Sequence, residues 1–169
     1  MITVNGTIYL LFTLAISLHN LEEAVWLPGW SKSAGRFHKE VSPDEFRFAV
    51  ILVTILAYLA TSLFLFFPEG VVFKYLYFGF LGAMLINVAA PHLVATVVLR
   101  RYMPGLITGV FLLWPVNGLI IWFAWKEELI SWAGLGMATL VVGGCLLVLI
   151  PFFFRFGELV TGTSKGIRS

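Results

Sequence analysis

The sequence predicts an all-α membrane protein: a bundle of five transmembrane helices, with the N-terminus outside and the C-terminus in the cytoplasm. Of the 169 residues, 60% are hydrophobic and 12% are charged, and the mean hydropathy is +0.96. Soluble domains carry about 25% charged residues, and a soluble protein of this size could not bury so much apolar surface. The same composition excludes a disordered chain, a disulfide scaffold and a nucleic-acid-binding protein with a basic face.

Apolar stretches set the number of helices. Four of them have the length of about 20 residues that a helix needs to cross a bilayer; they are 46–67, 76–99, 106–125 and 135–154. A fifth, 8–27, is interrupted by four polar residues: His19, Asn20, Glu22 and Glu23. Its uninterrupted part has the length of a signal-peptide core, but no basic segment precedes it and no clear cleavage site follows. We therefore expect it to be the first transmembrane helix.

The basic residues predict the orientation of the bundle. With five spans and an outside N-terminus, nine of them fall in segments that face the cytoplasm: Lys32, Arg36, Lys39, Arg47, Arg100, Arg101, Arg155, Lys165 and Arg168. Only Lys74 and Lys126 fall outside. This strong positive-inside bias requires an odd number of spans between the two ends. We expect one transmembrane domain over residues 1–156, followed by a polar cytoplasmic tail over 157–169.

Local signals mark the ends and contacts of the helices. The sequence SPDE at 42–45 predicts a capping box, with serine as N-cap and glutamate three residues later, at the start of the second helix. Proline and glycine at 104–105 predict a tight turn between the third and fourth helices. Gly79 and Ala83 are four residues apart, a spacing of small residues that favours close contact between membrane helices.

Ionisable side chains within a span cost a few kcal/mol each at the bilayer centre, so each of them needs a reason. At about 100° per residue, Glu22 lies roughly 60° to one side of His19 and Glu23 roughly 40° to the other. All three side chains are therefore expected to converge on one small volume, with Asn20 on its flank.

His92 is expected at the same depth as His19. His19 lies eight residues before the end of its stretch and His92 seven before the end of the third, which runs in the same direction. Both therefore lie roughly 10–12 Å from the inner boundary of the hydrocarbon, at about 1.5 Å per residue. Pro91 lacks the amide that would bond to the Asn87 carbonyl, so a kink is expected beside His92.

Two imidazoles and two carboxylates at that depth permit several interpretations. Neutral imidazole and carboxylate are ligands for zinc, iron or manganese, and their charge offsets that of a divalent cation. Without a cation, two neighbouring glutamates repel and one takes up a proton, which makes an acid/base pair. Proton or ion conduction, or a structural ion pair of Glu23 with Arg47, are further alternatives. We favour metal ligation by His19, Glu22, Glu23 and His92.

The string HNLEE at 19–23, in a first transmembrane helix, resembles the motif that names the HXXEE family of small bacterial membrane proteins. The resemblance continues in later elements: Asn87 and His92, the string YMPG at 102–105 after two arginines, Thr108 and Pro115. It covers about the first three quarters of the chain and implies a metal-binding enzymatic site at His19, Glu22, Glu23 and His92, without naming a reaction.

We therefore expect a multi-pass enzyme of the plasma (inner) membrane that uses a divalent metal (zinc, iron or manganese) and the catalytic carboxylates of Glu22 and Glu23. The expected supporting residues are Asn87, Tyr102, Asn117 and Arg47. The substrate is expected to be an apolar or amphipathic small molecule that enters from the inner leaflet, among the membrane lipids. A metal-free isomerase, a proton-coupled carrier and an assembly subunit stay open, as do the reaction, the number of metals and the oligomeric state.

Overall fold

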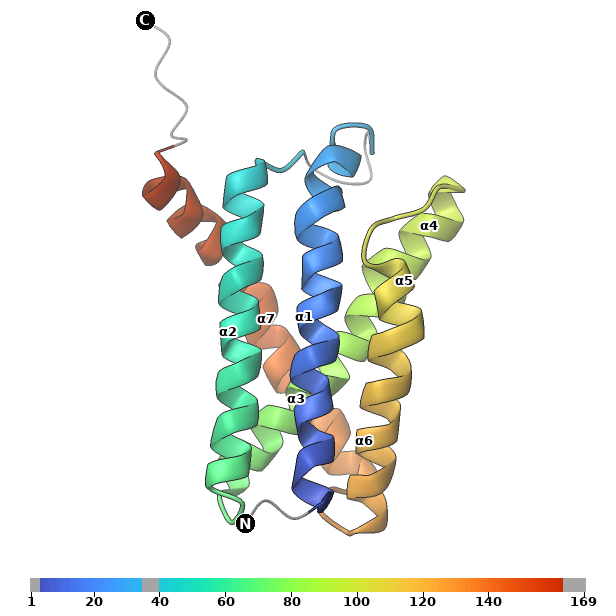
Figure 1. Cartoon of the computed structure of the whole chain (residues 1–169), viewed down its shortest axis with the longest axis vertical. Helices are drawn as coiled ribbons and strands as arrows, with labels where there is room; N and C mark the ends of the chain where they lie inside the picture. The colour runs from blue at the N-terminus through green and yellow to red at the C-terminus, as the bar shows by residue number, and fades with distance from the viewer. Residues whose placement is uncertain (1–3, 35–39, 163–169) are drawn as a thin grey trace, which may run out of the picture.

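The computed structural model describes residues 4–34 and 40–162. In this part of the chain, five helical stretches are long and apolar enough to cross a membrane: Gly6–Ser31, Pro43–Phe66, Val71–Leu99, Leu106–Lys126 and Trp132–Thr161. Each overlaps one of the five predicted stretches, which confirms the all-α fold and the number of spans. They run alternately up and down, so that α1 begins and α7 ends at opposite ends of the bundle (Figure 1).

Three of the spans are single α-helices, and two are composite. The single helices are α1 (Val4–Ser31), α2 (Pro43–Phe66) and α7 (Trp132–Thr161). The third span consists of α3 (Val71–Asn87), the wider turns of η2 (Val88–Leu93) and α4 (Val94–Leu99). The fourth consists of α5 (Leu106–Thr108), the wider turns of η3 (Gly109–Leu113) and α6 (Trp114–Lys126). Each interruption lies near a proline: Pro91, where a kink was predicted, lies within η2, and Pro115 is the second residue after η3.

The structure adds detail at two of the helix ends. α7 continues through Pro151 to Thr161, so the helix passes the expected end of the transmembrane domain at residue 156, and 163–169 lie outside the described residues. α2 begins at Pro43 as predicted, but the Ser42 hydroxyl makes no capping hydrogen bond. Only the Ser42 carbonyl accepts a bond, from the amide of Phe46 at 3.0 Å. The expected capping box was therefore wrong, although the position of the helix start was right.

One end of the bundle, where α1 ends, α2 begins and α7 ends, carries most of the described basic residues; we call it the basic end. It holds Lys32, Arg47, Arg100, Arg101 and Arg155. Lys74 and Lys126 lie at the opposite end, as the order of the helices requires.

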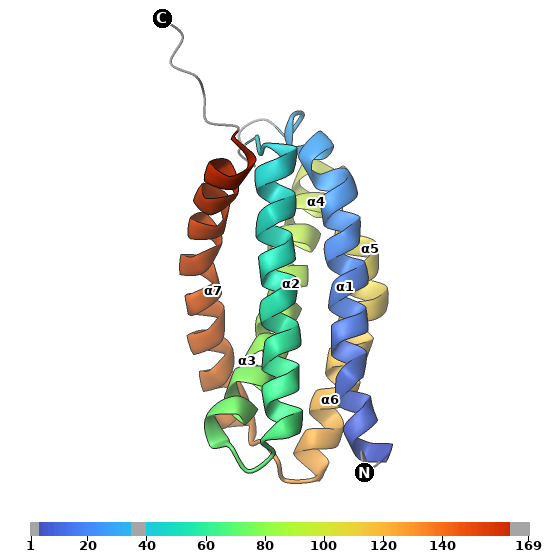
Figure 2. The same cartoon turned by 60° about the vertical axis from the view of Figure 1, so that its left-hand side comes forward.

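Small residues allow α3 and α7 to cross at close range. A Cβ atom at Gly79 would lie 2.5 Å from the Ala138 carbonyl oxygen, and the Ala83 side chain faces Gly143, so the predicted contact of Gly79 and Ala83 with another helix is formed. Towards the basic end the third and fifth spans separate, with α4 and the end of α7 on different sides of the bundle (Figure 1, Figure 2). This separation leaves room for a cavity between them.

Candidate metal centre

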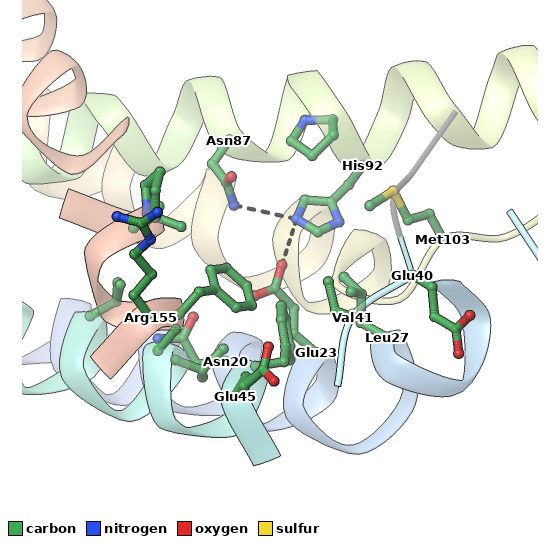
Figure 3. A pocket seen from close by; sticks show the side chains of 18 of the residues that line it. Asn20, Glu23, Leu27, Glu40, Val41, Glu45, Asn87, His92, Met103 and Arg155 are labelled. Carbon is green, nitrogen blue, oxygen red and sulfur yellow. Dashed lines mark hydrogen bonds and ion pairs between the residues drawn. The ribbon is translucent and has the colours of Figure 1, made fainter. Parts of the chain in front are cut away.

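Three ligand-type side chains converge between α1 and η2. The Nε2 atom of His92 lies 2.8 Å from Oε1 of Glu23, and Nε2 of His19 lies 3.7 Å from the same oxygen. One ligand atom from each of the three residues lies within 4.8 Å of the others. His19 is 0% exposed, His92 1% and the Glu23 side chain 14%. Figure 3 shows the Glu23 carboxylate directed at the His92 ring.

The broken helix around Pro91 places His92 in this cluster. Ala90 leaves the helical conformation, with φ −139° and ψ 112°, so the kink predicted beside His92 is present. The His92 ring packs edge-on against the His19 ring, with centroids 5.2 Å apart. The amide nitrogen of Asn87 lies 3.3 Å from His92 Nε2 (Figure 3). Asn87 therefore contacts the cluster directly.

The turn between the third and fourth spans covers the two imidazole rings. Gly105 has a positive φ of 95°, which glycine adopts without steric cost. A Cβ atom at this position would lie 2.5 Å from Cε1 of His92 and 3.1 Å from Cε1 of His19. The backbone at Gly105 therefore packs closely against both rings, and there is no space for a side chain.

Glu22 lies outside the group of three ligands, although we expected it among the metal ligands. Its Oε1 accepts hydrogen bonds from the Tyr102 hydroxyl and from the Gly105 amide at 2.8 Å. Its Oε2 accepts from the amide of Thr108 at 3.0 Å and from the Thr108 hydroxyl at 2.5 Å. Burial and then the Glu22 carboxylate raise the pKa of Tyr102 to about 12, so the phenol keeps its proton and donates. Glu22 thus anchors the turn that covers the histidines.

The structure places the other expected supporting residues outside the group of three ligands. Tyr102 contacts Glu22 and not the ligand group. Asn117 is fully buried and donates to the Leu81 carbonyl at 3.2 Å, which joins α6 to α3 away from the cluster. Asn20 lies on the flank, as predicted, and donates to the Thr54 hydroxyl of α2 at 2.7 Å.

Arg47 does not contact Glu23. Its Nε donates to the Ala24 carbonyl at 3.2 Å, and its Nη1 lies 3.9 Å from the Asp44 carboxylate. The side chain is 53% exposed. Among the described residues the ion-pair partners of Glu23 are the two histidines, so the alternative of a structural Arg47–Glu23 pair has no contact to support it.

This geometry predicts that Arg47→Leu lowers the free energy of unfolding by no more than about 1 kcal/mol, because an exposed arginine beside a carbonyl contributes little. The effect should add to that of Glu23→Gln in the double variant. A thermal-unfolding cycle of both single variants and the double variant in detergent measures this. A coupling above about 1 kcal/mol between the two positions would mean that they are partners after all.

Glu23 and His92 face a cavity of about 670 Å³ between α1, α2, η2 and α7 (Figure 3). Apolar side chains form most of its wall: Leu27, Phe46, Val50, Val53, Met84, Met103, Ile150 and Phe154. Charged side chains lie where it reaches the basic end: Glu40, Glu45, Arg155 and Glu158. The cavity therefore joins an apolar interior, a charged rim and the polar pair at its wall.

Neither Thr108 nor the residues at the rim had a predicted role. Thr108 contacts both Glu22 and Nδ1 of His19, the latter at 3.1 Å. Two signals pointed to Thr108: its part in the family resemblance, and its place three residues after the turn glycine, near the start of a helix, where amides are free to bind a carboxylate. The rim residues carry no such signal, because they meet only through the positions of α2 and α7.

The match to known proteins is extensive in sequence. The family model described as "Protein of unknown function with HXXEE motif" matches residues 10–122. The chain belongs to the HXXEE family. A Bacillus subtilis (strain 168) protein named "Uncharacterized protein YrkK" is 51% identical over 150 residues, which cover 89% of this chain and 95% of that protein. No solved structure matches the chain.

Membership of the HXXEE family confirms the resemblance seen in the sequence. The matched region contains all of the cluster and the turn that covers it, from the motif in α1 to Thr108. It ends before α7 begins at Trp132. The part of the cavity wall that α7 contributes therefore lies outside the region that the family model matches.

Proposed function

We propose that this HXXEE protein is a membrane-embedded enzyme in which His19, Glu23 and His92 hold one divalent metal ion. The observation that carries the proposal is the convergence of these three side chains inside a membrane span, at the wall of a cavity. Two histidines and one carboxylate are a common ligand set for zinc and for iron, and three protein ligands leave a coordination position open for chemistry. We expected Glu22 among the ligands as well, but in this proposal it anchors the turn that covers the histidines.

The donor atoms fit a cation. His19 Nε2 is buried and has no hydrogen-bond partner, and an unpaired buried polar atom is costly. Nε2 of His92 lies 2.8 Å from the Glu23 carboxylate oxygen, so it donates a hydrogen bond to that oxygen when no cation is bound. A divalent cation would take the place of that proton, would give His19 Nε2 a partner, and would offset the charge of the carboxylate.

The cavity supports an amphipathic substrate. Its apolar wall suits a hydrocarbon chain, and its charged rim suits a polar group at the basic end. The excess of basic residues there favours the cytoplasmic side, which supports a site in the inner-leaflet half of the plasma membrane. Glu23 is the most exposed of the three ligands, and it lines the cavity. It is therefore the residue that orients a polar group of the substrate and exchanges a proton with it, while a bound divalent ion supplies Lewis acidity.

A metal-free acid/base enzyme is a second candidate, because Glu23 and His92 are also close enough, at 2.8 Å, to share a proton. In that case the same pair would move a proton on a substrate in the cavity, as in an isomerase.

Metal analysis of protein purified in mild detergent without chelators separates the two candidates. We expect one zinc, iron or manganese ion per chain, lost in His19→Ala, Glu23→Gln and His92→Ala because each removes one of three ligands. Glu45→Gln, which changes a carboxylate at the rim of the same cavity, is the matched control and should keep the metal. A folded wild-type protein that takes up none of the three metals, even when they are added back, would exclude the metal enzyme and favour the acid/base pair.

A further inference from the structure

The two glutamates of the motif have opposite surroundings, although they are adjacent in sequence. Glu23 faces the histidines and the cavity. Glu22 is 6% exposed and accepts four hydrogen bonds from the covering turn and the start of the fourth span. This second environment determines where the proton of His19 lies.

The hydroxyl of Thr108 has one proton, which it donates in a hydrogen bond to Glu22. The amides of Gly105 and Thr108 can only donate, so the Glu22 carboxylate serves as an acceptor at both oxygens. The Thr108 Oγ1 atom lies 2.5 Å from Oε2 of Glu22, a short distance typical of a hydroxyl that donates to a charged oxygen. The two lone pairs of this Oγ1 atom can therefore only accept hydrogen bonds.

A lone pair of Thr108 Oγ1 faces Nδ1 of His19 at 3.1 Å. Two acceptors at this distance would repel, so Nδ1 of His19 must carry a proton and donate. In a neutral imidazole the other nitrogen then has the lone pair. That nitrogen is Nε2, which is buried, lacks a hydrogen-bond partner and lies nearest to Glu23.

We propose that Glu22 and Thr108 are positioning residues that hold His19 in the Nδ1–H tautomer, so that its Nε2 lone pair is presented to Glu23 and His92. His19 donates to Thr108, and Thr108 donates to Glu22. The arrangement is a carboxylate–histidine pair in which one hydroxyl lies between the two partners. Such outer partners fix the ring and tautomer of metal-bound histidines in other proteins. The tautomer itself is a property of the metal-free protein; only its effect on metal affinity rests on the proposed function.

Nitrogen NMR of chelator-treated protein labelled with ¹⁵N-histidine tests this inference, because protonated and unprotonated ring nitrogens resonate far apart. The His19 signals are identified by their loss in His19→Gln. We expect Nδ1 protonated and Nε2 unprotonated in the wild type. Thr108→Val removes the acceptor while keeping the shape, and should shift His19 toward the Nε2–H form. Thr108→Ser restores the hydroxyl and should restore the tautomer.

Thr61→Val is the matched control, since the Thr61 hydroxyl is also buried but bonds to Ala57 of its own helix; it should leave His19 unchanged. A wild-type His19 with a proton on Nε2 would overturn the inference, as would an unchanged His19 in Thr108→Val. If the metal proposal also holds, Thr108→Val should weaken metal affinity about 10- to 100-fold. A correct tautomer without any metal binding would reject the proposed function and keep the positioning role.

Discussion

Gly105→Ala should distort the candidate metal centre more than any other change of comparable size. The new methyl group would lie 2.5 Å from Cε1 and 2.8 Å from Nδ1 of His92, and both rings are buried. The backbone φ of 95° adds strain of about 1–3 kcal/mol for a residue other than glycine. We expect a clearly lower melting temperature in detergent together with the loss of bound metal.

The chain provides a control that separates strain from crowding. Gly162, at the end of α7, also has a positive φ, of 66°, but a Cβ atom there would meet nothing within 4 Å. Gly162→Ala should therefore show the backbone cost alone and keep the metal. Gly118→Ala, in a helix with open space around it, should show neither effect. If Gly105→Ala behaved like Gly162→Ala, the close packing of the turn on the histidines would be wrong.

The sequence was sufficient to predict the meeting of His19 and His92, because depth in a membrane is set by position along a helix. The first and third spans run in the same direction, and the two rings meet with centroids 5.2 Å apart. They meet although the first span continues beyond its expected end to Ser31, which puts His19 12 residues (31 − 19) and His92 seven (99 − 92) before the ends of their spans. Pro91 then marked the place where the third span is broken. These signals are local, because they depend on the residues of one span and not on how the other spans pack.

The sequence was not sufficient to divide the two glutamates. Adjacent residues on a helix point about 100° apart, which is enough for each to face a different neighbour. Glu23 faces η2, whereas Glu22 faces the turn before α5. A helical arc predicts the side of α1 but not which elements pack on each edge of it. The cavity could not be predicted either, because it depends on how far α7 diverges from η2 beyond the crossing at Gly79.

Glu22→Leu should cost several kcal/mol of stability even in protein stripped of metal. The change leaves the buried amides of Gly105 and Thr108 without an acceptor, at about 1–3 kcal/mol for each unpaired group. It also removes the acceptor of the Tyr102 and Thr108 hydroxyls. Unfolding of chelator-treated protein in detergent is the measurement.

Because the protein is stripped of metal, this experiment distinguishes an anchor from a ligand. A glutamate that served only as a metal ligand would destabilise the metal-free protein when charged and buried, so Glu22→Leu would then leave its stability unchanged or raise it. Glu158→Leu is the matched control: it removes a carboxylate from the rim of the cavity, where surface changes usually stay within about 0.5 kcal/mol. A large loss in Glu22→Leu with little change in Glu158→Leu would place the stabilising role of the motif in its first glutamate. Glu23, which faces the two histidines and the cavity, would then be the motif carboxylate of the candidate metal centre.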